Sequence, residues 1–315
     1  MNPLNNQDGM ALLLVLVIVT LLSALLIDFS FSTLVDLRAT ETFRDRTKAY
    51  YLARGGVEAA RMILQQDKNQ YDHPSEFWGD ELANIPAGDG DVSIDITDLS
   101  GRLNLNYIGD SRGNPLTSYH RFVALCEEVL QLEYEQCREL ADSLVHWYNA
   151  DMTKVTPDDA YYSSLSPSYS RRGAKLATLE ELALVKGFTP EIIERLKPYV
   201  RVVGGDQINL NTASPATLYA WQYSSEPGVV EIIFDRWDID ALVAYRQQNP
   251  YNTLQDLSLA EGIGNRWAAA WLQGSVAVQG TVFQVVSRGR VNQGTRWAQA
   301  IVSKQDNQLL SLKVE

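Results

Sequence analysis

The opening segment, residues 1–30, reads MNPLNNQDGMALLLVLVIVTLLSALLIDFS and changes abruptly at Gly9 and Met10. The nine residues up to Gly9 contain no Lys or Arg, whereas the eighteen residues from Met10 to Ile27 carry no charge and include only one Thr and one Ser. As a helix this run would be about 27 Å long, which is enough to cross the hydrocarbon core of a bilayer. The sequence therefore predicts a transmembrane helix over residues 10–27.

The leader, residues 1–9, does not have the form of a secretory signal. Such a signal has a cationic start, a shorter apolar core and small residues at a cleavage site after that core. Here the leader has no Lys or Arg, and no cleavage site of this kind precedes Asp28. Two alternatives remain. The chain is either an uncleaved single-span anchor, or a precursor cut after Gly9 that keeps its apolar helix, as in the type IV pilin class. In the second case Met10 is the mature N-terminus and Leu14 is the fifth residue, where most pilins have Glu.

The helical pattern continues beyond the apolar run and becomes amphipathic over residues 28–70. Apolar residues recur at spacings of three and four, which places them on one helix face: Tyr50, Ala53, Val57, Ala60 and Leu64. The pair Gly55-Gly56 interrupts good helix formers, so we expect either a bend or a close packing contact there.

The rest of the chain switches between two periodicities. Residues 92–96 alternate apolar and polar as a strand does, and a turn at Leu99–Gly101 predicts a hairpin with residues 102–105. From about residue 115 the pattern is helical, and three further strands follow at 282–286, 296–303 and 309–313. The sequence predicts an α+β fold in which residues 71–114 and 276–315 form a small domain with an antiparallel sheet, interrupted by an all-α domain over residues 115–275.

An internal repeat lies within this inserted segment. TLEELALVKGF, from Thr178, matches TLQDLSLAEGI, from Thr253, and the tripeptide NLN occurs at residues 104–106 and 209–211. Each longer copy begins with a capping Thr and ends at a Gly, so two helix-turn-helix units of one plan are predicted.

The second unit continues as LAEGIGNRWAAAWL and is similar to a helix-hairpin-helix, whose glycines either bind a nucleic-acid phosphate or serve packing. Residues 236–272 hold three Arg, four carboxylates and no Lys, and the whole chain has a net charge of −12. Because phosphate binding needs clustered positive charge, the packing role is favoured and no nucleic-acid partner is expected.

Residues 146–162, HWYNADMTKVTPDDAYY, gather oxygen ligands around a loop. Asn149, Asp151, Asp158 and Asp159 are the ligand types that Ca²⁺ takes, although the spacing is not that of an EF-hand. The other interpretation is a solvated helix end and loop. Nearby, Cys126 and Cys137 would lie about 16 Å apart on one straight helix, but a turn near Leu132 would bring them within reach of a disulfide.

Catalytic motifs are not evident. The three histidines, His73, His120 and His146, have no nucleophile elbow beside them, and the two cysteines form no Cys-x2-Cys pair. The sequence therefore predicts a protein that is not an enzyme and has no catalytic residues.

Several stretches, in this order, resemble the minor pseudopilin K family (GspK) of the type II secretion system. They are the Gly9–Met10 junction without Glu at the fifth mature position, YYLARGGVEAA, DLSGRLNLN, ADSLVHWYNAD with PDDAYY, LEELALVKGF and INLNTASPATL. The resemblance extends over nearly the whole chain.

The resemblance implies a type IV pilin-like helix and sheet interrupted by the helical domain, and a role at the tip of the periplasmic pseudopilus. It further implies cleavage between Gly9 and Met10 by prepilin peptidase, a single-pass inner-membrane anchor with a periplasmic body, and minor pseudopilins I and J as partners. Calcium occurs in some members of the family. Asp151 and Asp159 match the acidic pattern, whereas Asp158 stands in place of Glu and Asn149 in place of Asp. The alternative hypothesis is a membrane-tethered helix-hairpin-helix receptor for DNA uptake.

Overall fold

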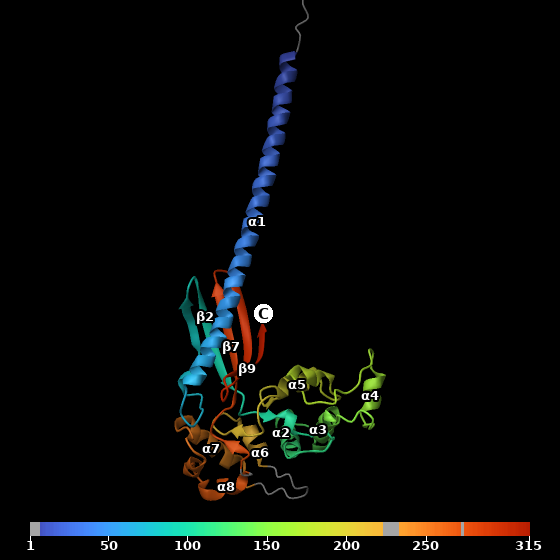
Figure 1. Ribbon diagram of the computed structural model, residues 1–315, viewed down its shortest axis with the longest axis vertical. Coiled ribbons are helices and arrows are strands. Elements are labelled where there is room, and N and C mark those ends of the chain that lie inside the picture. The colour runs from blue at the N-terminus through green and yellow to red at the C-terminus, as the bar shows by residue number, and fades with distance from the viewer. Residues whose placement is uncertain (1–6, 223–232, 272–273) are drawn as a thin grey trace, which may run out of the picture.

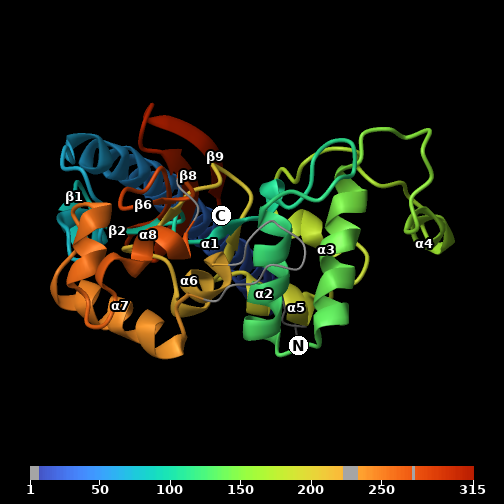
Figure 2. The ribbon, with the colours of Figure 1, turned by 90° about the horizontal axis from the view of Figure 1, so that it is seen from below.

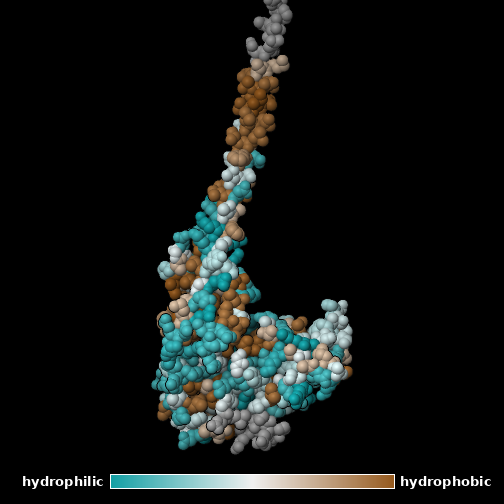
Figure 3. Space-filling model, in the orientation of Figure 1, coloured by the Kyte–Doolittle hydropathy of each residue, from teal (hydrophilic) through white to brown (hydrophobic). Residues whose placement is uncertain are grey.

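A computed structural model describes residues 7–222, 233–271 and 274–315. Helix α1 (Gln7–Gln66) extends for 60 residues without interruption and projects from the body (Figure 1). Its first part, from Gly9 through residue 40, is exposed along its whole length, and its mean hydropathy reaches 3.1 over an 18-residue window. Figure 3 shows this part as a continuous apolar surface that gives way to polar residues nearer the body.

The lower half of α1 packs on a five-stranded antiparallel sheet with the order β1-β2-β7-β8-β9. The strands are β1 (Leu82–Ala87), β2 (Gly90–Asp98), β7 (Val282–Val291), β8 (Gly294–Ser303) and β9 (Gln308–Val314). Four of the five residues on the predicted apolar face are buried, since Ala53, Val57, Ala60 and Leu64 are at most 1% exposed, whereas Tyr50 is only half-buried. They join Ile94, Phe283 and Val285 in one core. Burial of this face holds the helix to the sheet.

Small residues allow the helix to approach the sheet closely. A Cβ added to Gly289 of β7 would lie 2.2 Å from the backbone oxygen of Ala49, and one added to Gly56 would lie 2.0 Å from Ser287 Oγ. The helix continues without a break through the paired glycines, and close packing is the reason for Gly56.

Strand β2 pairs with β7 from Asp91 opposite Arg290 to Asp98 opposite Phe283. Two segments far apart in the sequence are thus neighbours in the sheet, and the chain between them leaves the sheet at Asp98 and returns at Val282. The three C-terminal strands form as predicted. The predicted hairpin between residues 92–96 and 102–105 was wrong, because the turn at Ser100 and Gly101 takes the chain out of the sheet, and Leu103 pairs in parallel with Val200 instead.

The segment between Asp98 and Val282, called the inserted block below, has a hydrophobic core of its own. Its helices and strands are β3 (Leu103–Asn104), α2 (Ser118–Leu130), α3 (Tyr134–Tyr148), α4 (Asp159–Ser164), α5 (Pro190–Leu196), β4 (Val200–Arg201), β5 (Ile208–Asn209), α6 (Pro215–Trp221), α7 (Arg236–Gln248), α8 (Trp267–Ala270) and β6 (Val276–Ala277). Short 3₁₀ helices lie at Phe77–Gly79, Leu105–Tyr107, Leu179–Leu184, Leu254–Leu259 and Gly264–Arg266. Figure 2 shows α2, α3 and α5 on one side and α6, α7 and α8 on the other.

The two halves of this inserted block repeat one design, as the sequence repeats predict. In each half a two-residue strand ends at the first NLN asparagine and pairs in parallel with the strand that closes the unit: β3 with β4, and β5 with β6. Asn106 holds the backbone of Leu176 and Val202, and Asn211 holds that of Tyr251 and Val278. The buried asparagines therefore fix the loops of each unit.

Candidate functional site

The face of α1 that points away from the sheet is exposed and partly apolar. Phe43, Tyr51 and Met62 are 73%, 65% and 59% exposed, and their separations of eight and eleven residues keep them on one side of a helix. Gly55 lies on this side, and a Cβ there would meet no atom within 4 Å. Nothing in the described chain therefore requires glycine at this position, which leaves room for another molecule to approach the helix backbone.

An open groove of about 610 Å³ runs beside Phe43, between α1 and Arg296 of β8. Thr47, Tyr50, Tyr51 and Arg296 line it together with Phe43. An aromatic and cationic groove next to an exposed helix face is suited to holding a protein segment rather than to chemistry, since the residues lining it include no carboxylate, thiol or imidazole.

The predicted processing junction lies at the start of α1. Gly9 and Met10 are helical and exposed, and Leu14 is 58% exposed on the apolar part of the helix. Residues 1–6 of the leader lie outside the described residues. Cleavage between Gly9 and Met10 stays a prediction.

The predicted calcium ligands do not converge on one point. Asp158 is buried between an imidazole and an ammonium group, with Oδ2 2.7 Å from His146 Nδ1 and Oδ1 2.6 Å from Lys186 Nζ. Burial opposes its ionisation, but these two partners hold the pKa of Asp158 below its usual value. Asp159 pairs with Arg171, and the exposed Asp151 accepts hydrogen bonds from Thr153. As arranged, these carboxylates do not fit a calcium site.

The two cysteines lie side by side on antiparallel helices. The chain reverses at Gln131, which adopts a left-handed conformation at the end of α2, and α3 begins at Tyr134. The predicted turn near Leu132 is therefore present. Both thiols are free and buried, and the hydrogen bond with Cys137, together with burial, raises the pKa of the Cys126 thiol. No bridge is formed in this structure, so the disulfide stays a prediction.

The two Gly-containing hairpins are packing elements. Gly187 and Gly262 have φ values of +87° and +75°, and the residues after them, Phe188 and Ile263, are buried in the core. Arg266, the cation nearest the second hairpin, pairs with Asp238. Positive charge that could bind a phosphate is therefore already neutralised within the protein.

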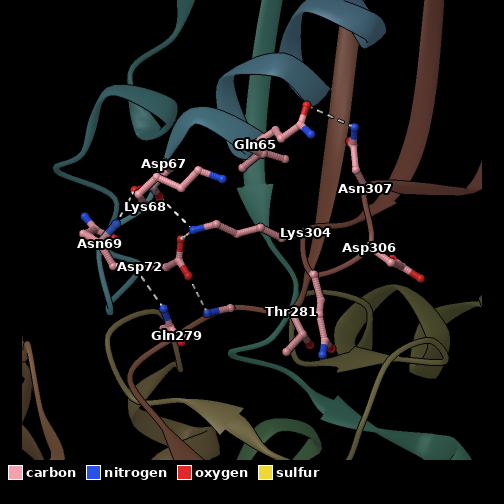
Figure 4. A pocket seen from close by; sticks show the side chains of 13 residues that line it. Gln65, Asp67, Lys68, Asn69, Asp72, Gln279, Thr281, Lys304, Asp306 and Asn307 are labelled. Carbon is pink, nitrogen blue, oxygen red and sulfur yellow. Dashed lines mark hydrogen bonds and ion pairs between the residues drawn. The ribbon is translucent and has the colours of Figure 1, made fainter.

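A polar pocket of about 660 Å³ lies where the end of α1, the C-terminal strands and the inserted block meet (Figure 4). Lys304, from the turn after β8, reaches into it and places Nζ 2.7 Å from Asp67 Oδ2 and 2.6 Å from Asp72 Oδ1. Asp72 is fully buried, and its other oxygen accepts the N–H of Gly280 at 2.8 Å. Burial raises the pKa of Asp72 to about 6, against the pull of Lys304.

This pocket is a joint between the two parts of the protein. The Asp72 backbone oxygen accepts Asn209 Nδ2, which also reaches Asp98 Oδ2 at 2.8 Å, and Ser100 Oγ accepts the N–H groups of Thr281 and Val282. Asp67, Asp72 and Glu76 are close enough to share a metal ion, but Lys304 already supplies a positive charge to the first two. The repeated NLN motif indicated Asn209, whereas no sequence signal marked Lys304.

The histidines do not form a catalytic site. His73 Nδ1 contacts the hydroxyl and the N–H of Ser75 in a local turn, and His146 holds Asp158. Neither arrangement joins an activated nucleophile to a base and an orienting carboxylate.

Comparison with known proteins identifies relatives. Residues 101–205 match the family model for type II secretion system (T2SS) protein K. The chain is 28% identical over 228 residues to type II secretion system protein K of Aeromonas hydrophila, which covers 66% of this chain and 68% of that protein. It is also 28% identical over 240 residues to the Klebsiella pneumoniae protein K, covering 72% and 73%.

A solved structure shares the fold. One chain of the GspK-GspI-GspJ complex from enterotoxigenic Escherichia coli superposes with a TM-score of 0.67 at 18% identity, covering 88% of this chain and 99% of that chain. This likeness confirms the predicted fold class, a long N-terminal helix on an antiparallel sheet interrupted by a helical block. These matches give no support to the DNA-uptake alternative. The family model and the two relatives thus confirm the resemblance to type II secretion system protein K that the sequence motifs indicated.

Proposed function

We propose that this chain is a minor pseudopilin that caps the tip of the type II secretion pseudopilus and initiates its assembly, in protein export across the outer membrane. Its match to the protein K family model and its similarity to protein K of Aeromonas hydrophila support a role in secretion. The inserted block lies at the end of the sheet away from the apolar helix (Figure 1). Such a bulky block would obstruct subunits stacked beyond it, which suits a terminal position.

The proposed topology is a single-pass inner-membrane protein whose body lies in the periplasm. Prepilin peptidase removes residues 1–9, and the exposed apolar part of α1 stays as the anchor. Leu14 supports the terminal position as well. The Glu usual at this place in pilins is thought to contact the amine of the next subunit, and a tip subunit has no such neighbour.

The proposed partners are the cognate minor pseudopilins I and J, and the proposed role is structural rather than enzymatic. The observation that carries this proposal is the exposed face of α1 with Phe43, Tyr51, Gly55 and Met62. Exposed apolar side chains grouped on one face of a helix mark an interaction surface, and an exposed Gly permits close approach of a second helix. The E. coli relative was crystallised as a GspK-GspI-GspJ complex.

Co-purification tests the partner surface. The full-length chain is co-expressed with its cognate I and J proteins in membranes, and Tyr51→Glu and Met62→Glu are expected to abolish their recovery, because a charge would be buried in the contact. Leu259→Glu is the matched control, since Leu259 is 62% exposed but lies in the inserted block. Recovery of I and J at the wild-type level with both the Tyr51→Glu and Met62→Glu variants would refute the proposal.

Processing is tested separately by sequencing the N-terminus of protein from native membranes. Met10 is the expected first residue of the wild type. In the Gly9→Val variant the leader should stay uncut, so the chain should still begin at Met1. A wild-type protein that still begins at Met1 would contradict cleavage and favour the uncleaved anchor.

A further inference from the structure

The loop between α3 and α4 is closed around a single side chain, Arg171. This side chain is 2% exposed, and all of its N–H groups point toward the loop. Nη1 lies 2.6 Å from each carboxylate oxygen of Asp159. Nη2 donates to the backbone oxygens of Asp151 at 2.7 Å and Lys154 at 2.9 Å, and Nε donates to that of Asn149 at 3.2 Å.

These contacts amount to an oxygen cage filled by a guanidinium. A two-oxygen carboxylate contact together with backbone carbonyls is the kind of donor set that surrounds Ca²⁺ in proteins. Here the donors are directed at a planar group that donates five hydrogen bonds, so the position is taken by a charge that belongs to the chain.

The second acidic group of the loop is neutralised in the same way. Asp158, which is 3% exposed, lies between His146 and Lys186, and Lys186 comes from the first hairpin. Asp159 also accepts the N–H of Thr156 at 2.7 Å. Burial opposes ionisation of Asp159, but Arg171 and Thr156 hold the pKa of its carboxyl below the usual value. Each of the two carboxylates therefore has its own cation: Lys186 for Asp158 and Arg171 for Asp159.

We infer that Arg171 is the built-in cation of the 149–159 loop and that the loop keeps its fold without a divalent metal. The oxygen ligands of this loop suggested a calcium site, and the side chains as arranged here do not fit one. The inference does not depend on the proposed role at the pseudopilus tip.

A thermal unfolding experiment on the full-length chain in detergent micelles tests this directly. The melting temperature of the wild type is measured with millimolar CaCl₂ and with excess EDTA, and the two values are expected to agree. Calorimetric titration of the wild type with CaCl₂ should show no saturable heat. A melting temperature that falls in EDTA and recovers with CaCl₂, or saturable binding that Asp159→Asn removes, would overturn the inference.

Variants at residue 171 test the role of the side chain itself. Arg171→Ala is expected to lower the melting temperature by roughly 5 °C or more, because it leaves Asp159 and three carbonyls without their donor. Arg171→Lys keeps the charge but cannot donate to every acceptor, so its melting temperature should lie between those of the wild type and Arg171→Ala. It also supplies a folded variant if Arg171→Ala does not fold.

Arg172→Ala is the matched control. Arg172 is the adjacent arginine and pairs with Glu181 outside the cage, so its loss should shift the melting temperature far less. Equal melting temperatures for Arg171→Ala, Arg172→Ala and the wild type would show that Arg171 does not hold the loop.

Discussion

Adjacent glycines in α1 are predicted to respond to the same substitution with opposite signs. In Gly56→Ala the new Cβ would lie 2.0 Å from Ser287 Oγ and 2.8 Å from Val92 Cγ2, both in the interface between helix and sheet. Ser287 is fully buried, so its hydroxyl has little space to move. Overpacking of this kind costs about 1–3 kcal/mol, and the better helix propensity of Ala returns up to about 1 kcal/mol. We expect a net loss of about 1–2 kcal/mol.

Gly55→Ala is the internal control, because its Cβ meets nothing within 4 Å and only the propensity gain of up to about 1 kcal/mol remains. The assay is urea unfolding of the full-length chain in micelles, followed by circular dichroism. Ser287→Gly removes the clashing atoms and should restore part of the stability of Gly56→Ala. Gains for both alanine variants, or losses for both, would refute the close approach of helix and sheet at this position.

Three other predictions concern buried polar groups and the thiol pair. The folded pKa of Asp72, raised to about 6, lies above its unfolded value, so this group favours the folded state at low pH, and that contribution is lost as pH rises from about 4 to 6. Lys304→Met should therefore lower the free energy of unfolding by roughly 3 kcal/mol at pH 8, where Asp72 is ionised, and by much less at pH 5. The measurement is thermal unfolding as a function of pH, and an equal loss at both pH values would contradict the pairing. Protein recovered from an oxidising compartment should contain a disulfide between Cys126 and Cys137, so its intact mass should be about 2 Da lower than that of the reduced protein. The free energy of unfolding should exceed that of Cys137→Ser by about 3 kcal/mol. Two thiols that can be alkylated after unfolding would exclude the disulfide. Asn106→Ala removes the partner of the Leu176 N–H and of the Leu176 and Val202 carbonyls, and should lower the free energy of unfolding in urea by about 2–4 kcal/mol. An unchanged free energy of unfolding would show that water replaces the amide and would contradict this role of Asn106.

The features that the sequence predicted correctly are those carried by local periodicity. The apolar run after Met10, the buried stripe on α1 and the three C-terminal strands each follow from the spacing of apolar residues over one element. The capping residues Thr178 and Thr253 could be identified in the same way, because a cap is a contact between residues a few positions apart, although the turns that follow them are 3₁₀ rather than α-helical.

The candidate site could be predicted only in part. The acidic residues of the 149–159 loop were visible in the sequence, but their partners were not. Arg171 and Lys186 lie 12 and 28 residues beyond the carboxylates that they neutralise, and nothing in an isolated Arg or Lys shows which anion it will face. The calcium hypothesis rested on ligand types alone and could not include the Arg and Lys that pair with these carboxylates.

The sequence by itself determined that this protein has an apolar helix long enough to span a membrane, continued by an amphipathic stretch, and two repeated units between strands, because hydrophobic periodicity and capping act over a few residues. Only the tertiary structure decided that β2 pairs with β7 rather than with residues 102–105, and that Lys304 meets Asp72 at the joint between the two parts. These contacts link residues nearly two hundred or more positions apart. Their energies depend on burial and on which elements meet, and neither quantity is contained in any local stretch of the chain.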